Sequence, residues 1–215
     1  ANGTDGVLIV NITDSANPQL IRRINTLGNA NDVALSADGN TMFVANGESG
    51  VRVFDITDPL LPRTLDIVET NAQAKSIVLS PDGRLAAVAN GSGGLVLLNS
   101  ENPASLSQLS RVELAGTAKA VTLDPTGKLA YVTGSRAGLH SIDISKPRQP
   151  LRIHTMNTPG YASDVTLTKD GHHALVADWN EGFRVLHVRP PSSFSAEIET
   201  VSAEVTPQSA SIQLI

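Results

Sequence analysis

The chain has 215 residues, 40% of them hydrophobic but only 3% aromatic, so its core must be built mainly from aliphatic side chains. A net charge of −5 argues against a nucleic-acid-binding surface, which needs a basic stripe. The absence of cysteine excludes disulfides and thiolate chemistry, and no run of about 18 apolar residues that could span a membrane is present.

In chain order, short strands follow one another without a helical stretch. Residues 6–13 are predicted as the first strand, because β-branched residues alternate there behind a glycine. Residues 14–18 have the composition of a turn, and residues 19–27 are predicted as a second, half-exposed strand. The next four strands, joined by tight turns, are predicted over residues 33–36, 41–45, 51–57 and 63–68.

This group of four strands recurs every 44 residues. The interval is kept without an insertion in four columns: Asp38, Asp82, Thr126 and Asp170; Gly6, Gly50, Gly94, Gly138 and Gly182; Asn11, Asp55, Asn99, Asp143 and His187; Ala30, Ala74, Ala118 and Ala162. The first column begins turn dipeptides in which the following glycine supplies the positive φ that a hairpin needs. A four-stranded antiparallel unit at this interval is typical of a β-propeller blade.

The sequence therefore predicts an all-β fold, a β-propeller of four-stranded antiparallel blades. The predicted divisions are the outer half of a blade at 1–28, blades at 29–72, 73–116, 117–160 and 161–201, and a candidate inner strand within 202–215. In the last part, residues 196–201 are predicted as a fourth strand and residues 211–215 as a first strand. Three interpretations are open: about five blades that close one ring, a fragment of a six- to eight-bladed ring, or a separate β-rich module that begins at Pro190-Pro191.

The composition of the strands predicts where each one lies in a blade. The first two strands of each unit are the most apolar, so we expect them to be sandwiched between neighbouring blades. The fourth strand carries charged side chains such as Arg63, Asp66 and Arg111, so we expect it at the outside. The alanine column just before each first strand is expected to meet a packing requirement near the central channel.

Several short motifs mark the repeat. They are Thr158-Pro159-Gly160-Tyr161-Ala162, Asp164-Val165, Ala177-Asp178, Gly182-Phe183-Arg184-Val185, and Asp55-Ile56-Thr57-Asp58-Pro59 with Pro62. Together they resemble the LVIVD repeat family of bacterial propellers, and Tyr131-Val132-Thr133 is also similar to the related YVTN propellers. The resemblance covers residues 1–190. It implies a propeller of an exported or cell-surface bacterial protein, hence an extracytoplasmic location, and leaves function open because propellers host many activities.

Candidate binding residues lie where the repeats disagree. In a propeller, ligands usually meet the face where first strands begin and where second and third strands connect. At the first-strand positions, the polar residues Asp32, Lys75, Lys119 and Asp164 would suit a polar or charged small ligand, or a cation held by the carboxylates. In the connecting turns, the candidates are Arg136, Asp178 and Trp179, the only tryptophan. Surface charges and ordinary packing are the alternative interpretation of both groups.

Motifs for catalysis or metal binding are missing. The sequence has no G-x-S-x-G nucleophile motif, no phosphate-binding G-x-x-x-x-G-K-[ST] loop and no calcium-binding loop. His172 and His173 are adjacent in sequence, so in a strand they point to opposite faces and cannot readily share one ion. No catalytic residue, metal site or cofactor is therefore predicted.

Three functions fit this sequence. The preferred hypothesis is a non-catalytic interaction module that presents its rim to a protein or glycan, with no nucleic-acid partner. The second is a propeller enzyme of the lactonase or dehydrogenase type with a polar site in the central channel, as the YVTN-like resemblance implies. The third is a structural repeat within a large adhesin, whose full-length chain would contain further repeats of this kind.

Overall fold

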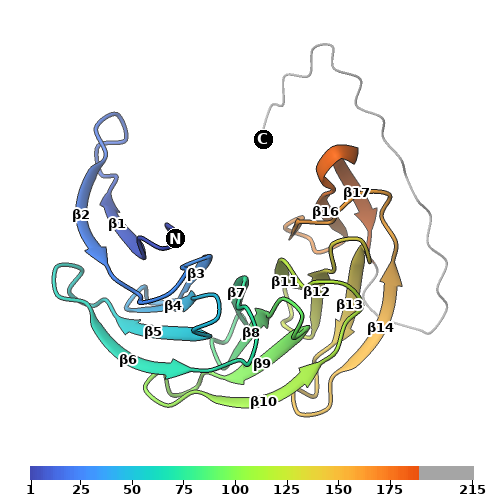
Figure 1. The fold of residues 1–215 in the computed structure, drawn as a ribbon, viewed down its shortest axis with the longest axis horizontal. Coiled ribbons are helices and arrows are strands. Elements are labelled where there is room, and N and C mark those ends of the chain that lie inside the picture. The colour runs from blue at the N-terminus through green and yellow to red at the C-terminus, as the bar shows by residue number, and fades with distance from the viewer. Residues whose placement is uncertain (189–215) are drawn as a thin grey trace.

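The computed structural model describes residues 1–188, which form five antiparallel β-sheets arranged around a common axis (Figure 1). The first sheet has two strands, β1 (Val7–Asn11) and β2 (Gln19–Ile24). Three sheets of four strands follow, and the last sheet has three described strands. This confirms the predicted all-β propeller architecture. The predicted strands at residues 196–201 and 211–215 lie outside the described residues.

The three complete blades repeat the same strand order from the axis outward. The first contains β3 (Asp32–Leu35), β4 (Thr41–Ala45), β5 (Val51–Asp55) and β6 (Arg63–Val68). The second contains β7 (Ser76–Leu79), β8 (Leu85–Ala89), β9 (Leu95–Asn99) and β10 (Ser107–Val112). The third contains β11 (Val121–Leu123), β12 (Leu129–Thr133), β13 (Leu139–Asp143) and β14 (Leu151–Met156).

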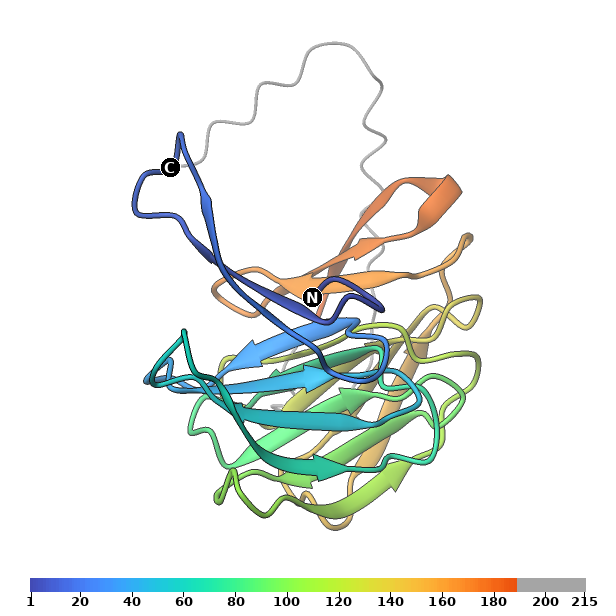
Figure 2. The same cartoon turned by 60° about the vertical axis from the view of Figure 1, so that its left-hand side comes forward.

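The last described blade has β15 (Asp164–Leu167), β16 (His173–Ala177) and β17 (Phe183–His187). A short 3-10 turn, η1 (Trp179–Glu181), joins β16 to β17. In the view down the axis, β3, β7 and β11 lie innermost, whereas β2, β6, β10 and β14 form the periphery (Figure 1). Figure 2 shows the same sheets from the side, stacked face to face around the ring.

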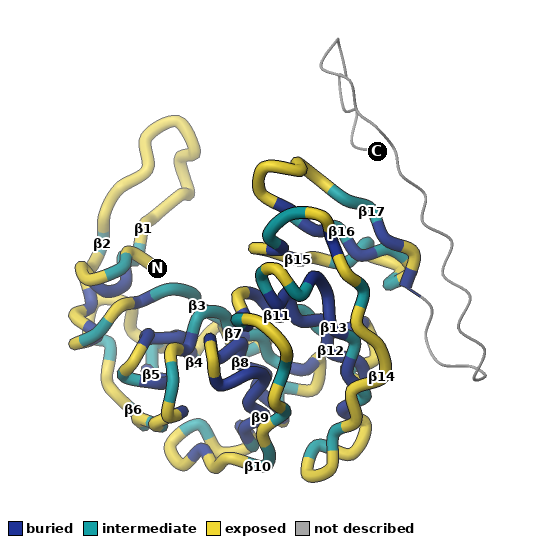
Figure 3. Tube along the Cα trace, turned by 45° about the vertical axis from the view of Figure 1, so that its right-hand side comes forward, coloured by how far each residue is buried: buried dark blue, intermediate teal, exposed yellow. Residues whose placement is uncertain are grey.

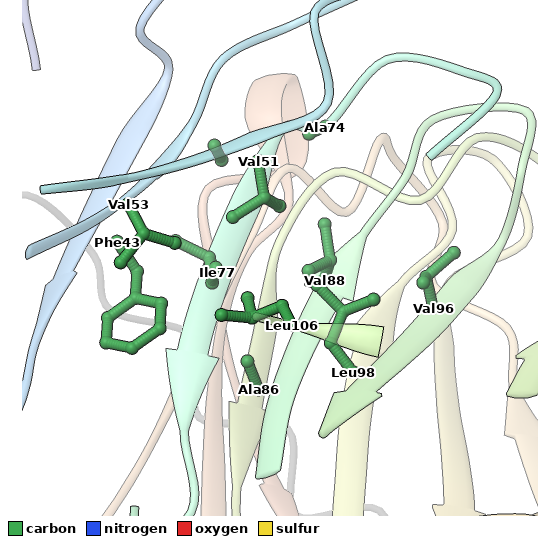
Figure 4. Packing of buried hydrophobic residues seen from close by; sticks show 11 residues of the cluster. Phe43, Val51, Val53, Ala74, Ile77, Ala86, Val88, Val96, Leu98 and Leu106 are labelled. Carbon is green, nitrogen blue, oxygen red and sulfur yellow. The ribbon is translucent and has the colours of Figure 1, made fainter. Parts of the chain in front are cut away.

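The hydrophobic core lies between the blades. One cluster joins the β3–β6 blade to the β7–β10 blade, and it includes Phe43, Val53, Ile77 and Val88 (Figure 4). Equivalent clusters occupy the other three interfaces between consecutive sheets of the described chain. Full burial of one such aliphatic side chain contributes about 1.5–3 kcal/mol, so each blade is stabilised chiefly by its neighbours.

The predicted order of burial within a blade was wrong in one respect. The second and third strands are the most buried, since β8 is buried throughout and β9 is buried except for its last residue (Figure 3). The first strands are only half-buried, as β3 illustrates. The reason is their position, because a strand that borders the channel has neighbouring blades on fewer sides. The fourth strands are largely exposed, as predicted.

Consecutive blades are also joined through their backbones. The turn between the second and third strands of one blade forms an isolated β-bridge with the loop that leads into the next blade. The four bridges pair Gly3 with Ala30, Gly47 with Ala74, Gly91 with Ala118, and Ser135 with Ala162. Each alanine of the column is buried at its bridge. The alanines therefore occupy crowded contacts between blades.

Candidate functional site

The candidate site lies on one face of the blades, which we call the rim. The rim consists of the turns between second and third strands and the loops that lead into the first strands. Its most distinctive feature is a contact of three side chains from two blades: Arg136, Tyr161 and Trp179. We call these three residues the rim cluster. Arg136 belongs to the turn between β12 and β13, Tyr161 precedes β15, and Trp179 begins η1.

The rim cluster is held by an aromatic contact and a cation. The rings of Tyr161 and Trp179 meet edge to face, with centroids 5.6 Å apart and planes at 73°. The guanidinium of Arg136 lies 4.8 Å from the centroid of the tyrosine ring, and its Nε donates a hydrogen bond to the tyrosine hydroxyl. Trp179 nevertheless remains 68% exposed. The tyrosine thus supports a tryptophan whose surface is still available to a ligand.

Asp178 holds the backbone beneath the tryptophan. Its carboxylate is fully buried and accepts hydrogen bonds from the Thr158 hydroxyl at 2.7 Å and from the Gly160 amide at 3.0 Å. The Arg184 guanidinium lies 3.5 Å from the same carboxylate. These contacts bind the turn at η1 to the loop that carries Tyr161. Asp178 is therefore placed to position the rim cluster, and its own oxygens face the protein.

We call this contact, between a rim turn and the loop that leads into the same blade, a latch. Equivalent contacts occur at Asn46, Asn90 and Gly134 of the same repeat column. Asn46 and Asn90 donate from their side-chain amides to the backbone carbonyls of Thr26 and Thr70. At Gly134 the side chain is missing, and His140 from the following strand donates to the Ala115 carbonyl instead, at 2.9 Å. Only at Asp178 does the latch carry a carboxylate.

The predicted channel residues are placed at the heads of the inner strands. Asp32 begins β3, and one carboxylate oxygen accepts a 3.0 Å hydrogen bond from the amide of Ile77 in the next blade, while the other binds its own neighbour Val33. Asp164 begins β15 and is exposed, and its carboxylate accepts a hydrogen bond from the adjacent Val165 amide at 2.8 Å. Asp32 thus has a contact that joins two blades, whereas within residues 1–188 the Asp164 carboxylate contacts only its own neighbour.

The two lysines flank these strands without joining the acids. Lys75 is half-buried and Lys119 is exposed, and each uses its backbone amide to pair with a second strand. Within residues 1–188, neither ammonium group takes part in an ion pair. The inner strands β3 and β15 are separated in the ring by β7 and β11. Asp32, Lys75, Lys119 and Asp164 therefore remain a predicted set rather than one contact cluster.

Sequence reasoning missed Tyr161 as a site residue. Its repeat column contains Asn29, Gln73, Thr117 and Tyr161, so the aromatic side chain appears in one blade only. Arg136 and Trp179 were predicted from the same kind of departure, in the turns. The departure of Tyr161 from its repeat column was thus visible in the sequence. The sequence did not show that Arg136, Tyr161 and Trp179 are in contact across two blades.

Two depressions indent the described surface. One lies on the rim, has a volume of about 730 Å³, and is lined by polar residues that include Glu48, Gln73 and Ser92. The other, of similar volume, lies on the opposite face between the β7–β10 and β11–β14 blades. Over residues 1–188, no three His, Cys, Asp or Glu side chains are grouped so as to hold a metal ion. In the same range, no helix is long and apolar enough to cross a membrane.

Comparison with known families identifies the repeat. The model of the LVIVD repeat matches the sequence three times, over residues 27–70, 115–158 and 159–200. These matches cover more than half of the chain. No curated protein matches it.

Solved structures with a similar fold are propellers. The periplasmic gluconolactonase PpgL of Pseudomonas aeruginosa is 19% identical with a TM-score of 0.80, and the match covers 94% of this chain and 65% of that protein. A protein from Lactobacillus plantarum is 16% identical with a TM-score of 0.77, covering 92% and 63%. A putative 6-phosphogluconolactonase from Bacteroides uniformis is 16% identical with a TM-score of 0.71, covering 80% and 53%. The chain thus spans less than two thirds of these proteins, and likenesses at this identity show the fold alone.

Proposed function

This chain belongs to the LVIVD repeat family, and from that premise we propose that it is a non-catalytic interaction module of an exported or cell-surface bacterial protein. It binds a protein or glycan partner through its rim. The observation that carries the proposal is the rim cluster, in which the 68% exposed Trp179 rests on Tyr161 with Arg136 alongside.

The composition of the rim cluster supports binding. Tryptophan, tyrosine and arginine are the residues that most often dominate the binding energy of protein interfaces. A flat aromatic face offers apolar area, and the indole N–H and the remaining guanidinium N–H groups supply donors for hydroxyl or carboxylate oxygens. The same set suits the faces and hydroxyls of a sugar ring.

The support beneath the cluster favours the same function. The buried Asp178 latch and the tyrosine contact restrict the turn before any partner arrives. A partner that covers Trp179 then loses less conformational entropy than it would on a mobile loop, so a modest area can bind with useful affinity.

A glycan array tests the proposal directly. The tagged chain is applied to printed glycans, and each bound glycan is then titrated in solution while the fluorescence of Trp179, the only tryptophan, is followed. We expect a saturable change in emission, and we expect Trp179→Ala to abolish binding on the array. Leu61→Ala is the matched control, because Leu61 is 63% exposed in a turn on the opposite face.

A protein partner is tested at the same position. A photoreactive phenylalanine placed at residue 179 should cross-link to a defined partner, whereas the same group at residue 61 should not. The proposal fails if neither assay gives binding, or if every ligand binds Trp179→Ala as well as it binds the wild-type chain.

A second candidate is a lactonase-type enzyme with a polar site in the central channel. It is favoured by the similarity to the gluconolactonase PpgL at a TM-score of 0.80, together with the polar heads of the inner strands, Asp32 and Asp164. This candidate requires hydrolysis of a sugar lactone such as gluconolactone and loss of that activity in Asp164→Ala. A purified chain with no lactone hydrolysis above the buffer rate, with or without divalent ions, would exclude it.

A further inference from the structure

Two histidines face each other in the last described blade. His173 begins β16 and His187 ends β17, and the two residues are direct partners in the antiparallel ladder. The equivalent partners in the three preceding blades are Thr41 with Asp55, Leu85 with Asn99, and Leu129 with Asp143. Both positions of one cross-strand pair have therefore changed to histidine in the same blade and in no other described one.

The backbone brings these two side chains as close as a sheet allows. The Val188 amide donates to the His172 carbonyl at 2.8 Å, so the hydrogen-bonded partners lie one residue beyond the histidines. His173 and His187 thus form a non-hydrogen-bonded pair, the type in which facing side chains approach most closely. The ring centroids are 5.2 Å apart, and the ring planes meet at 81°.

This separation matches a shared metal ion. A metal–nitrogen bond to imidazole is about 2.0–2.1 Å long, so two imidazoles on one tetrahedral ion have centroids about 5 Å apart. We infer that His173 and His187 form a two-imidazole site for a divalent transition metal ion such as Zn²⁺, Ni²⁺ or Cu²⁺. Imidazole is a preferred ligand of these ions, whereas Ca²⁺ and Mg²⁺ prefer oxygen.

The first histidine is held in place by its turn. The His173 amide donates to the Thr168 hydroxyl at 3.0 Å, and the same hydroxyl donates to Asp170 at 2.6 Å. That hydrogen bond from Thr168 keeps the pKa of Asp170 below its ordinary value, and the neighbouring His172 and His173 act in the same direction. An ionised carboxylate close to the pair raises the local affinity for a cation.

The strand geometry determines which two histidines can bind the same metal ion. Adjacent residues of a strand point to opposite faces, so His172 and His173 do not share an ion. The partner of His173 comes from the neighbouring strand, 14 residues later in the chain. The described protein supplies these two ligands, and water completes the coordination.

Isothermal titration of the metal-free full chain with NiCl₂ and ZnCl₂ tests the site. We expect one ion per chain, with the dissociation constant raised at least about tenfold in His173→Leu and His187→Asn. These replacements are the residues that the repeat itself uses at Leu129 and Asn99. His172→Leu is the matched control and should bind as the wild-type chain does. Asp32→Ala and Asp164→Ala should also bind normally, which separates this site from the channel site of an enzyme.

A second measurement does not depend on the variants. In the histidine ring region of the NMR spectrum, Ni²⁺ below one equivalent should broaden the signals of His173 and His187 first, before those of His140 and His154. The inference is wrong if the wild-type chain takes up no ion at millimolar concentration. It is equally wrong if His173→Leu, with unchanged melting in the absence of metal, binds the ion as tightly as the wild-type chain does.

Discussion

The Asp32 carboxylate at the head of β3 accepts a 3.0 Å hydrogen bond from the Ile77 amide in β7. The same relationship recurs one blade later, where the Ser76 hydroxyl lies 3.4 Å from the Val121 amide. Both contacts join inner strands of consecutive blades close to the channel. A residue predicted for its charge thus serves at least partly to join two blades.

Replacing Asp32 with alanine should destabilise the fold. The substitution leaves the amide of the buried Ile77 without its acceptor, and such a loss costs about 1–3 kcal/mol. Urea denaturation followed by circular dichroism measures the difference in the free energy of unfolding. Asp164→Ala is the control and should change it by less than about 0.5 kcal/mol, because Asp164 is exposed and, among residues 1–188, bonds only to its neighbour. Equal effects would contradict the role assigned to Asp32.

At the buried latch residue Asn90, the nearly isosteric replacement by aspartate should destabilise the fold more than truncation to alanine does. Its side-chain amide donates to the Thr70 carbonyl at 2.7 Å, and its carbonyl accepts from the Thr70 hydroxyl at 2.8 Å. Asn90→Asp replaces that donor with a carboxylate oxygen, which repels the carbonyl in a buried site. We therefore expect Asn90→Asp to lower the melting temperature more than Asn90→Ala does. An aspartate tolerated here as well as at Asp178 would show that Thr70 can reorient.

Two glycines with the same φ should respond differently to alanine. Gly94 has φ +72°, and an added Cβ would lie 2.1 Å from the Val112 carbonyl oxygen. Gly83 has φ +71°, but an added Cβ would have no atom within 4 Å. Gly83→Ala should cost about 1–2 kcal/mol from the left-handed backbone alone. Gly94→Ala should cost distinctly more in the same urea titration, and equal values would contradict the close approach of the strands.

His140 should make the fold sensitive to mild acid. Burial lowers the pKa of His140 below its ordinary value of 6.5, because the charged imidazole loses its hydration. The unfolded chain therefore takes up the proton first, and stability falls as the pH decreases through 6.5 and towards the lower folded-state value. His140→Gln keeps a donor for the Ala115 carbonyl and should remove part of this loss, whereas the exposed His154→Gln should not. Unfolding midpoints measured from pH 7.5 to 5 provide the check.

The aspartates of the hairpin turns change the stability of the fold at a lower pH than His140 does. Hydroxyl donors from Ser36, Ser80 and Thr168 keep the pKa values of Asp38, Asp82 and Asp170 below 3.8. Their stabilisation is present above that pH and is lost as the pH falls below about 4. The effect of His140 can therefore be measured without them.

The fold was predictable because the residues that define its strands and turns recur every 44 residues. The 44-residue columns define the strand order, the hairpins at Gly39 and its equivalents, and the exposed outer strands, all of which depend on residues close in sequence. The burial order was not predictable in the same way. Whether a first strand such as β3 is enclosed depends on its position beside the channel in the assembled ring, which no single repeat encodes.

The site was predictable only as a set of positions. Arg136 and Trp179 depart from their repeat columns, so the sequence marked them, but their shared contact with Tyr161 arises because one blade's turn reaches the next blade's loop. His173 and His187 were likewise visible as residues, yet only the strand register shows that they are partners. Contacts between strands and between blades depend on the strand register and on the geometry of the ring. A comparison of equivalent positions in the repeats contains neither.

The bridges between each turn and the following alanine have a consequence for how such a chain changes in evolution. Gly47 meets Ala74, and Gly91 meets Ala118, with the same backbone groups each time. If the 44 residues 73–116 were lost by recombination between repeats, the turn at Gly47 would meet Ala118 instead and would form the same bridge. The unit that can be lost or gained is therefore any 44 consecutive residues and need not coincide with one blade. Recombination between any two equivalent positions preserves the β-bridges between blades. Propellers with different numbers of blades can therefore arise without an intermediate in which a bridge between blades is missing.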